Sequence, residues 1–445
     1  APTDAPTDAP TDAPTDAPTN APTNAPTNAP TTPQPTSGPT TAPSFSVSPT
    51  ATIGENSCIG DEACDGNTGI IGANSCNGPS ACTNNTAFIG DDSCNGIQAC
   101  NYDTNTARPI GQRIDNLSCN GDGACFNLLA DVGLESCNAQ LACTLNTGKI
   151  EGPGSCNGLA ACFQNQGSII SKGACHANET RFCDDGEVAE NCIPEDSDYM
   201  GVCQSNNHTI SEYACRDKAA CHMNRNAIGP RSCHGEHSCE NNGGQVQEDS
   251  CSGNAACFNN QGSIGPNSCI DIESCFTNAG DLIGGGSCHG LTACKNNTGN
   301  ISDNSCTFPN SCTKNNGDIG NLSCLDISSC TNNNGTIGNS SCVSLTSCSD
   351  NQGLIFGPNS CNGTLSCYNN TGAEIRSNAC SGVQACTNNM GTILEDSCRS
   401  SEACFENRGD IGKMSCIGEK KCCLNDRTIP DETCNTPEEV CSSCS

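Results

Sequence analysis

The chain has 445 residues, but it contains no Trp, only 3% aromatic residues and 34% apolar residues. This composition excludes the large apolar core that a globular chain of such length normally builds. The formal net charge of -31, from 18 Lys and Arg against 49 Asp and Glu, argues against nucleic acid as a partner and favours cations such as Ca2+. No apolar run of about 18 residues occurs, so no membrane insertion is expected.

Cysteine supplies the order that this composition otherwise lacks. The chain has 44 cysteines, an even number at regular spacing, which indicates disulfides formed in an oxidising compartment. Zinc is the competing interpretation, but zinc ligands are usually about two to four residues apart, and most pairs here are farther apart. We therefore predict a secreted protein, extracellular or at the cell surface. Because residue 1 is Ala, we also expect a processed or excised piece of a secreted precursor.

Residues 1–50 are the first predicted element, a disordered stalk or linker rich in Pro and Thr. The segment begins APTDAPTDAPTD, continues with APTNAPTN and contains no cysteine. Proline at every fourth position removes amide donors and favours extended, polyproline-like conformations. Its threonines are candidate acceptors for O-linked glycans, and an unmodified, semi-rigid linker is the alternative.

Residues 51–422 are the second element, a repeat with a period of 18 or 19 residues. Each unit follows the pattern I-G-x-x-S-C-x-x-x-x-[AS]-C-x-x-N-x-G-x, as in IGPNSCIDIESCFTNAGD. Units this short cannot bury an apolar face alone, so they must stack on one another. We predict an all-β fold, a parallel β-helix (β-solenoid) whose rungs each close three short strand faces, with the handedness left open. Its cysteine pairs, at about 4.8 Å a rung, correspond to a rod about 90 Å long.

Two columns of equivalent residues are expected to hold this stack together. The first is aliphatic, passes through Ile264, Ile283 and Ile301, and supplies a narrow dry core. The second consists of the cysteines, and a disulfide within one C-x5-C pair is worth roughly 2 kcal/mol in the chain-entropy model. Bonding between rungs also satisfies the permitted Cα separation, so the connectivity stays open. The predicted disulfide cysteines include Cys58, Cys64, Cys76, Cys82, Cys94, Cys100, Cys233, Cys239, Cys251, Cys257, Cys269 and Cys275.

A third column is asparagine, three residues after the second cysteine of each pair. Asparagine tolerates a left-handed turn, and stacked carboxamides can bond to one another along a rod, so we assign this column to a corner of the rung. A row of amides that recognises carbohydrate is the functional alternative. Members of the column include Asn242, Asn260, Asn278, Asn297, Asn315 and Asn333.

An acidic insertion interrupts the repeat at about residues 184–214, after a pair that the spacing assigns to Cys175 and Cys183. We expect a protruding loop closed by its own disulfide, with a Ca2+ or partner site as the functional alternative. After Cys422 the pattern ends, and residues 423–445 are predicted to form a disulfide-rich cap on the solenoid edge. The candidate Ca2+ ligands are Asp184, Asp185, Glu187, Glu195, Asp196 and Asp198.

Few residues in the repeat suggest chemistry. The sequence has no nucleophile–base signature, phosphate loop or recurring carboxylate pair, so we expect no enzyme activity and no cofactor other than Ca2+. His222, His234 and His237 fall on neighbouring rungs, where they are a candidate metal cluster against a default of solvated surface. N-x-S/T sequons, expected to carry N-glycans in part, begin at Asn84, Asn116, Asn178, Asn207, Asn296, Asn300, Asn321, Asn334, Asn339, Asn362 and Asn369.

The string SCNG-x-x-AC-x-x-N-x-G-x-IG, present as SCNGLAACFQNQGSI and SCSGNAACFNNQGSIG, resembles the cysteine-rich repeats of proteins secreted by diatoms and related stramenopile algae. The resemblance covers about residues 51–422 and implies a cell-surface or matrix location without a defined activity. The C-x5-C rung is also similar to the disulfide-braced coils of beetle antifreeze proteins. In this chain, however, the residues after the second cysteine form no regular threonine array.

We therefore expect a non-catalytic structural or adhesive protein of the cell wall, cell surface or extracellular matrix. Its expected partners are matrix polysaccharides, other wall proteins and further copies of itself. An ice-binding protein and a polysaccharide-acting β-helix enzyme are the alternatives. Thermal hysteresis would support the first, and loss of hydrolase or lyase activity on mutation of an acidic cluster would support the second.

Overall fold

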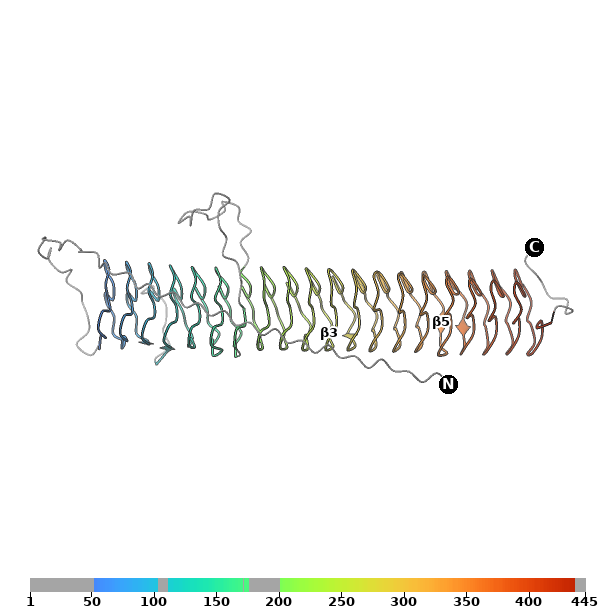
Figure 1. Cartoon of the computed structure of the whole chain (residues 1–445), viewed down its shortest axis with the longest axis horizontal. Helices are drawn as coiled ribbons and strands as arrows, with labels where there is room; N and C mark the ends of the chain where they lie inside the picture. Colours follow the sequence, from blue (N-terminus) through green and yellow to red (C-terminus); the bar gives the residue numbers. More distant parts are fainter. Residues whose placement is uncertain (1–51, 103–110, 171, 176–200, 437–445) are drawn as a thin grey trace, which may run out of the picture. The chain divides into compact units, whose positions relative to one another are not determined.

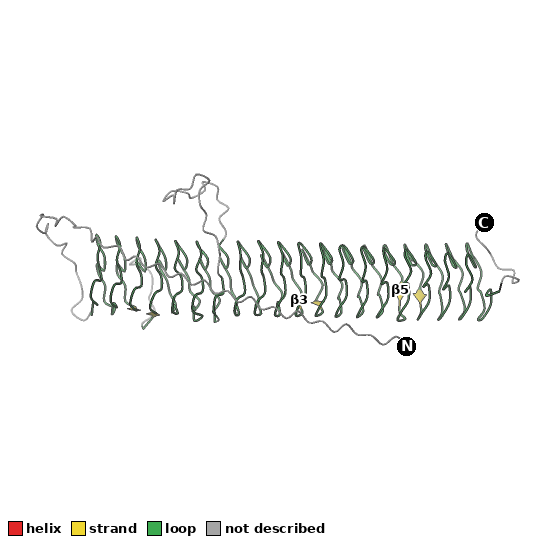
Figure 2. Ribbon diagram, in the orientation of Figure 1, coloured by secondary structure: helices red, strands yellow, loops and turns green. Residues whose placement is uncertain are grey.

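The structure, a computed structural model, describes residues 52–102, 111–170, 172–175 and 201–436. These residues form a stack of similar rungs, each joined to the next by parallel β-bridges (Figure 1). The described residues contain no α-helix, and turns and loops make up most of every rung (Figure 2). This part of the chain is therefore a non-helical, solenoid-like repeat. The predicted stalk and the candidate Ca2+ ligands lie outside the described residues.

The column of aliphatic residues holds the regular strands of the stack. Parallel pairs join β1 to β2, β3 to β4 and β5 to β6, and isolated parallel bridges continue the same column from Ile53 to Ile429. The Ile and Val side chains of this column from Ile71 to Ile411 are 0–2% exposed, so they form the core that the sequence predicts. The strands are β1 (Phe88–Ile89), β2 (Arg113–Ile114), β3 (Ser263–Ile264), β4 (Leu282–Ile283), β5 (Leu354–Ile355) and β6 (Glu374–Ile375).

The three strand faces predicted for each rung are absent from the described rungs, because left-handed residues recur in every one. In the rung closed by Cys306 and Cys312, φ lies between 55° and 57° at Asn304, Cys306, Asn310 and Lys314. Such a residue breaks an extended strand, since its backbone turns out of the β region. Each rung is therefore a series of turns around a short aliphatic strand position, and four rungs add a second column of parallel bridges through Arg216, His234, Ser252 and Ile270.

Among the described residues, each disulfide from Cys58–Cys64 to Cys416–Cys422 joins two cysteines of the same rung. Regular partners such as Cys324 and Cys330 are six residues apart, and their Cα atoms are 5.7 Å apart. The structure thus resolves the connectivity that the spacing leaves open in favour of bonds within rungs. We call the residues from the first to the second cysteine the disulfide loop, and the residues from there to the next first cysteine the connecting segment.

An asparagine ladder crosses the connecting segments in the column predicted for it. The Nδ2 group of Asn315 donates to Oδ1 of Asn297 in the preceding rung at 2.8 Å and to the carbonyl oxygen of Gly317 at 2.6 Å. Equivalent bonds run without a break from Asn146 to Asn425. These buried carboxamides are hydrogen-bonded within the stack, so they do not form a surface for carbohydrate.

A second polar ladder, which the sequence does not predict, is formed by the serine that precedes the first cysteine in most rungs. The hydroxyl of Ser305 accepts the N–H of Ser323 in the next rung at 3.2 Å and donates to the carbonyl oxygen of Gly320 at 2.8 Å. Ser305 and Ser323 are fully buried. Serine in this column therefore joins neighbouring rungs as the asparagines do.

The irregular rung is closed by Cys175 and Cys203, which are 28 residues apart, and the pairing of Cys175 with Cys183 is wrong. After Cys203 the regular pattern resumes, since Asn206 belongs to the asparagine ladder and Ile210 to the aliphatic column. These ladder contacts, and not the distance to the nearest cysteine, decide which cysteine closes the rung.

Two expected boundaries consequently move. The insertion expected at residues 184–214 begins after Cys175, and the chain has returned to the stack by residue 201. At the other end, the stack continues beyond Cys422, because Asn425 bonds to the asparagine before it at 2.9 Å and Ile429 bridges the aliphatic column. The cap predicted for residues 423–445 therefore starts with residues that still follow the rung pattern.

Candidate functional site

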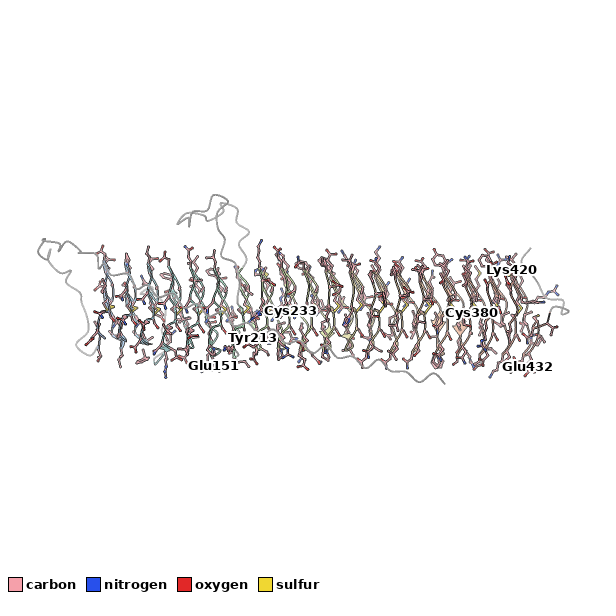
Figure 3. All side chains as sticks on the ribbon, in the orientation of Figure 1. Glu151, Tyr213, Cys233, Cys380, Lys420 and Glu432 are labelled. Carbon is pink, nitrogen blue, oxygen red and sulfur yellow. A yellow bond between two sulfur atoms is a disulfide. The ribbon has the colours of Figure 1, made fainter. Side chains whose placement is uncertain are left out.

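The disulfide loops and the connecting segments face opposite edges of the stack. Figure 3 places Lys420, in the loop closed by Cys416 and Cys422, at one edge, and Glu151 and Glu432, in connecting segments, at the other. Side chains near the loops differ from rung to rung, whereas the ladders repeat. A site for a specific partner is therefore expected on or beside the disulfide loops.

An exposed row of apolar side chains follows the tips of consecutive disulfide loops, in the third position after the first cysteine. Its large side chains are 43–50% exposed. Its members lie on consecutive rungs, except that one rung separates the last member from the others. Thr364 makes the one break in the row, and the exposed Phe308 widens it. We call this set the apolar row: Ile272, Leu291, Pro309, Ile327, Leu345 and Val383.

The surroundings of the apolar row are nearly uncharged from Leu291 to Val383. Of the residues directly before and after its members in this part, only Asp326 carries a charge, whereas Ile272, at the end of the row, lies between Asp271 and Glu273. An acidic chain would normally repel a second copy of itself, but this strip contributes little to that repulsion. Exposed apolar side chains in a contiguous strip are typical of interaction surfaces.

A cleft of about 450 Å³ lies on three rungs after the insertion. The guanidinium of Arg216 lies 5.4 Å from the centre of the Tyr213 ring. Arg231 donates two hydrogen bonds to the carboxylate of Asp249, at 2.7 and 2.6 Å, and these bonds hold the pKa of Asp249 below its usual value. The cleft thus presents one cation stacked on an aromatic ring and one cation already paired.

His234 also lines this cleft, but its side chain is hydrogen-bonded to the preceding rung. Its Nε2 donates to the carbonyl oxygen of Tyr213 at 2.8 Å. In other rungs an asparagine occupies this position directly after the first cysteine, and Asn95 makes the equivalent bond to the carbonyl oxygen of Asn74 at 3.1 Å. The structure therefore separates His234 from the metal cluster predicted for the three histidines.

His222 and His237 do come together, and they meet at Glu240, which the sequence analysis does not single out. Nδ1 of His222 lies 3.2 Å from Oε1 of Glu240, and Nδ1 of His237 lies 2.5 Å from Oε2. His222 is 4% exposed and Glu240 is 6% exposed. Burial by itself would raise the pKa of Glu240, but hydrogen bonds from the two histidines outweigh it and hold that pKa below its usual value of 4.5.

The spacing of 18 residues between His222 and Glu240 is the signal that could have revealed this pair. Both residues directly follow a second cysteine, so they occupy the same column on successive rungs. His237 lies in the disulfide loop of the rung that holds Glu240. A search for metal ligands among histidines alone misses the carboxylate between them.

Clusters of cysteine sulfur atoms along the stack offer no alternative metal site. The sulfur atoms of Cys94, Cys100 and Cys119 lie within 4.8 Å of one another, but all three residues are in disulfides. A disulfide sulfur is not the thiolate that a metal requires. The regular spacing of the cysteines therefore serves covalent closure of the rungs.

The sequons lie mostly on the surface of the stack. Asn178 lies outside the described residues, whereas Asn84, Asn296 and Asn362 are partly buried. None of the sequon asparagines belongs to the apolar row. The exposed sequon asparagines are Asn116, Asn207, Asn300, Asn321, Asn334, Asn339 and Asn369.

Comparison with known proteins identifies a family without assigning an activity. Three segments, residues 41–158, 212–329 and 323–439, match one family model, described as Domain of unknown function (DUF7640). No curated protein and no solved structure matches the sequence. Within the described residues, no helix is long and apolar enough to cross a membrane. The repeated domain and its regular disulfides indicate an extracellular repeat protein. Because the matched segments cover well over half of the chain, the protein belongs to the family described as Domain of unknown function (DUF7640).

Proposed function

We propose that the chain is a non-catalytic structural or adhesive protein of the cell wall, cell surface or extracellular matrix, secreted and in part N-glycosylated. Its stack would be a parallel β-helix, an architecture favoured by the parallel bridges of the aliphatic column. The observation that carries the functional proposal is the apolar row on consecutive rungs. In this proposal the row is the face through which one copy associates with another.

A second copy fits the apolar row because both surfaces have the same repeat. From Ile272 to Val383 the row spans six rung steps, or about 29 Å at about 4.8 Å a rung. Two such rows placed side by side keep their side chains in register over the whole length. Burial of aliphatic side chains contributes about 25 cal/mol per Å² of apolar surface removed from water.

Sedimentation of the purified full chain tests this association. We expect the native chain to dimerise, and we expect the triple variant Leu291→Ser, Ile327→Ser, Leu345→Ser to be monomeric at the same concentration. Serine fits this column, because Ser401 occupies it in another rung. Ile97→Ser is the matched control, since Ile97 is equally exposed in the same column but lies between Pro79 and Asp122.

The outcomes separate self-association from other partners. A native chain that is monomeric up to high concentration, or a triple variant that dimerises like the control, would contradict association through the apolar row. Binding of the native chain to an insoluble wall polysaccharide, lost in the triple variant, would instead assign the row to that polymer.

The two alternatives have less support from the described residues. In the column after the second cysteine, Thr144 and Thr313 bond to backbone carbonyl oxygens at 2.7 and 2.6 Å, so their hydroxyls are not free to match an ice lattice. A polysaccharide-acting enzyme would need a carboxylate poised in a cleft, and Asp249 is held by Arg231. Assays of thermal hysteresis and of polysaccharide cleavage test these alternatives directly.

A further inference from the structure

The His222–Glu240–His237 cluster departs from the pattern of its columns in a coordinated way. The residue after the second cysteine is often a threonine whose hydroxyl bonds to the preceding rung, as Thr313 bonds to Thr292. On two successive rungs this residue is instead His222 and then Glu240. A third ligand-type side chain, His237, joins them from the adjacent disulfide loop.

We propose that His222, Glu240 and His237 bind a divalent transition-metal ion, with Zn2+ as the ion that their chemistry fits best. Two imidazoles and one carboxylate are a common ligand set for zinc, and they leave a fourth position for water or a partner's side chain. Both imidazoles turn Nδ1 toward the Glu240 carboxylate, His222 toward Oε1 and His237 toward Oε2. The ion replaces the protons that now join the imidazoles to the carboxylate.

The distances from each histidine to Glu240 can be compared with those in a zinc site. Ligand atoms at about 2.0–2.2 Å from a tetrahedral zinc lie about 3.3–3.5 Å from one another. The His222 Nδ1 to Glu240 Oε1 distance of 3.2 Å is already close to that value. The His237 Nδ1 to Glu240 Oε2 distance of 2.5 Å must widen, and His237 can turn because its side chain is 32% exposed.

The surroundings of the cluster resemble the outer shell of a zinc site. Nε2 of His237 lies 3.5 Å from Oε1 of Glu236, so a second carboxylate faces the far nitrogen of this ligand. Metal-binding histidines commonly have such a carboxylate partner, which fixes the ring and strengthens its binding. The next two rungs place Phe258 and Phe276 in the same column, with ring centres 5.1 Å apart. These rings form an apolar wall beyond Glu240, on the side away from His222.

A bound ion also explains why a carboxylate is buried here. Glu240 is 6% exposed, and an ionised carboxylate at such a position needs a positive partner. Among the described residues, the ion-pair partners of Glu240 are His222 and His237, and neither Lys nor Arg is paired with it. A dication shared by three ligands supplies that charge.

Titration of the full chain with Zn2+ by calorimetry tests the proposal. We expect one tight site per chain in the native protein, and a loss of affinity of about tenfold or more in each of His222→Thr, Glu240→Thr and His237→Ser. These replacements suit the fold, because Thr and Ser occur in the same columns, for example at Thr313 and Ser328. His289→Asn is the matched control. It removes a histidine that is hydrogen-bonded to the preceding rung elsewhere in the stack, and it restores the asparagine common in that column.

The increase in melting temperature on adding Zn2+ separates loss of the site from loss of the fold. Each variant is compared with itself in the presence and absence of Zn2+, so a general change in stability cancels. Absorption spectroscopy at the zinc edge should report two imidazole ligands in the native protein. Native affinity no higher than that of Glu240→Thr, or a zinc-induced shift that survives in all three variants, would overturn the proposal.

Discussion

The two parts of each rung are held in place in different ways. In the connecting segment, Asn315 and Ser305 are buried and bonded to neighbouring rungs. In the disulfide loop, the serine before the second cysteine, such as Ser311, is buried without a hydrogen-bond partner. Alanine fills this position in other rungs, for example Ala293. The covalent bond closes the loop, so the side chain at this position need not join the rungs.

Within each rung, the connecting segment therefore supplies stability, whereas the disulfide loop and the residues beside it carry the variable side chains that a partner could recognise. The connecting segment repeats its asparagine, aliphatic and serine columns because each residue must match its counterpart in the next rung. The apolar row and the His222–Glu240–His237 cluster lie in or directly beside the disulfide loops, where the columns vary. Substitutions in the two parts should therefore have very different effects.

The largest effect is expected in the asparagine ladder. Asn315→Ala removes two hydrogen bonds and the acceptor for Asn333, so it should lower the free energy of unfolding by about 2–4 kcal/mol. Its neighbour Asn316 is the control, because its side-chain bonds to Thr298 and Asn334 are exposed to water, so Asn316→Ala should cost less than about 1 kcal/mol. Denaturant unfolding measures both, and equal costs would show that the ladder does not hold the rungs.

An intermediate effect is expected from opening one disulfide loop. The double variant Cys324→Ala, Cys330→Ala releases a short loop and should lower the free energy of unfolding by about 2 kcal/mol. The ladders of the adjoining connecting segments remain, so the chain should stay folded by circular dichroism. A larger cost than that of Asn315→Ala would mean that the loops, and not the connecting segments, hold the stack together.

A smaller effect, opposite in sign for the two parts, is expected from two serines of a single rung. Ser305→Ala breaks the bonds to Ser323 and Gly320 and should cost about 1–2 kcal/mol. Ser311→Ala removes a buried hydroxyl that lacks a partner, so it should be neutral or stabilise the protein by about 1 kcal/mol. In thermal unfolding, Ser305→Ala should lower the melting temperature, whereas Ser311→Ala should leave it unchanged or raise it. A similar decrease in both variants would contradict this contrast.

The smallest effect concerns acid stability. The folded-state pKa of Glu240 is lowered, so its contribution to stability is present above the unfolded-state value near 4.5 and is lost as the pH falls through the folded-state value. Glu240→Thr removes this contribution. The difference in melting temperature between the native chain and this variant should shrink as the pH is lowered from neutral to below about 4. A difference in melting temperature that stays constant across this pH range would show that the histidine neighbours do not lower the pKa of the Glu240 carboxyl group.

Much of the fold could be predicted from the sequence because its columns repeat. The spacing of Ile264 and Ile283 predicts the aliphatic core, and that of Asn297 and Asn315 predicts the asparagine ladder. The disulfide partners could not be derived, because the Cα separation of 5.7 Å within a rung and a stacking distance of about 4.8 Å are both permitted for a disulfide.

Other features required knowledge of contacts between rungs. Cys203 is followed by Asn206 and Ile210 at the usual offsets, so these columns could have identified it as the partner of Cys175. The serine ladder could have been found from the near-constant serine before the first cysteine, in contrast to the mixture of alanine and serine before the second. The left-handed cysteines had no comparable signal, because cysteine rarely adopts that conformation.

The closure of each disulfide within a single rung has a mechanical consequence. A stack pulled at its two ends can lengthen by peeling off one rung at a time. Each freed rung releases only its connecting segment, because the six-residue span between Cys324 and Cys330, for example, remains locked. For an 18-residue rung, the extensible contour is thus about two thirds of the chain. Reductants would unlock the remaining third, so the reach of the protein under tension depends on the redox state of its surroundings.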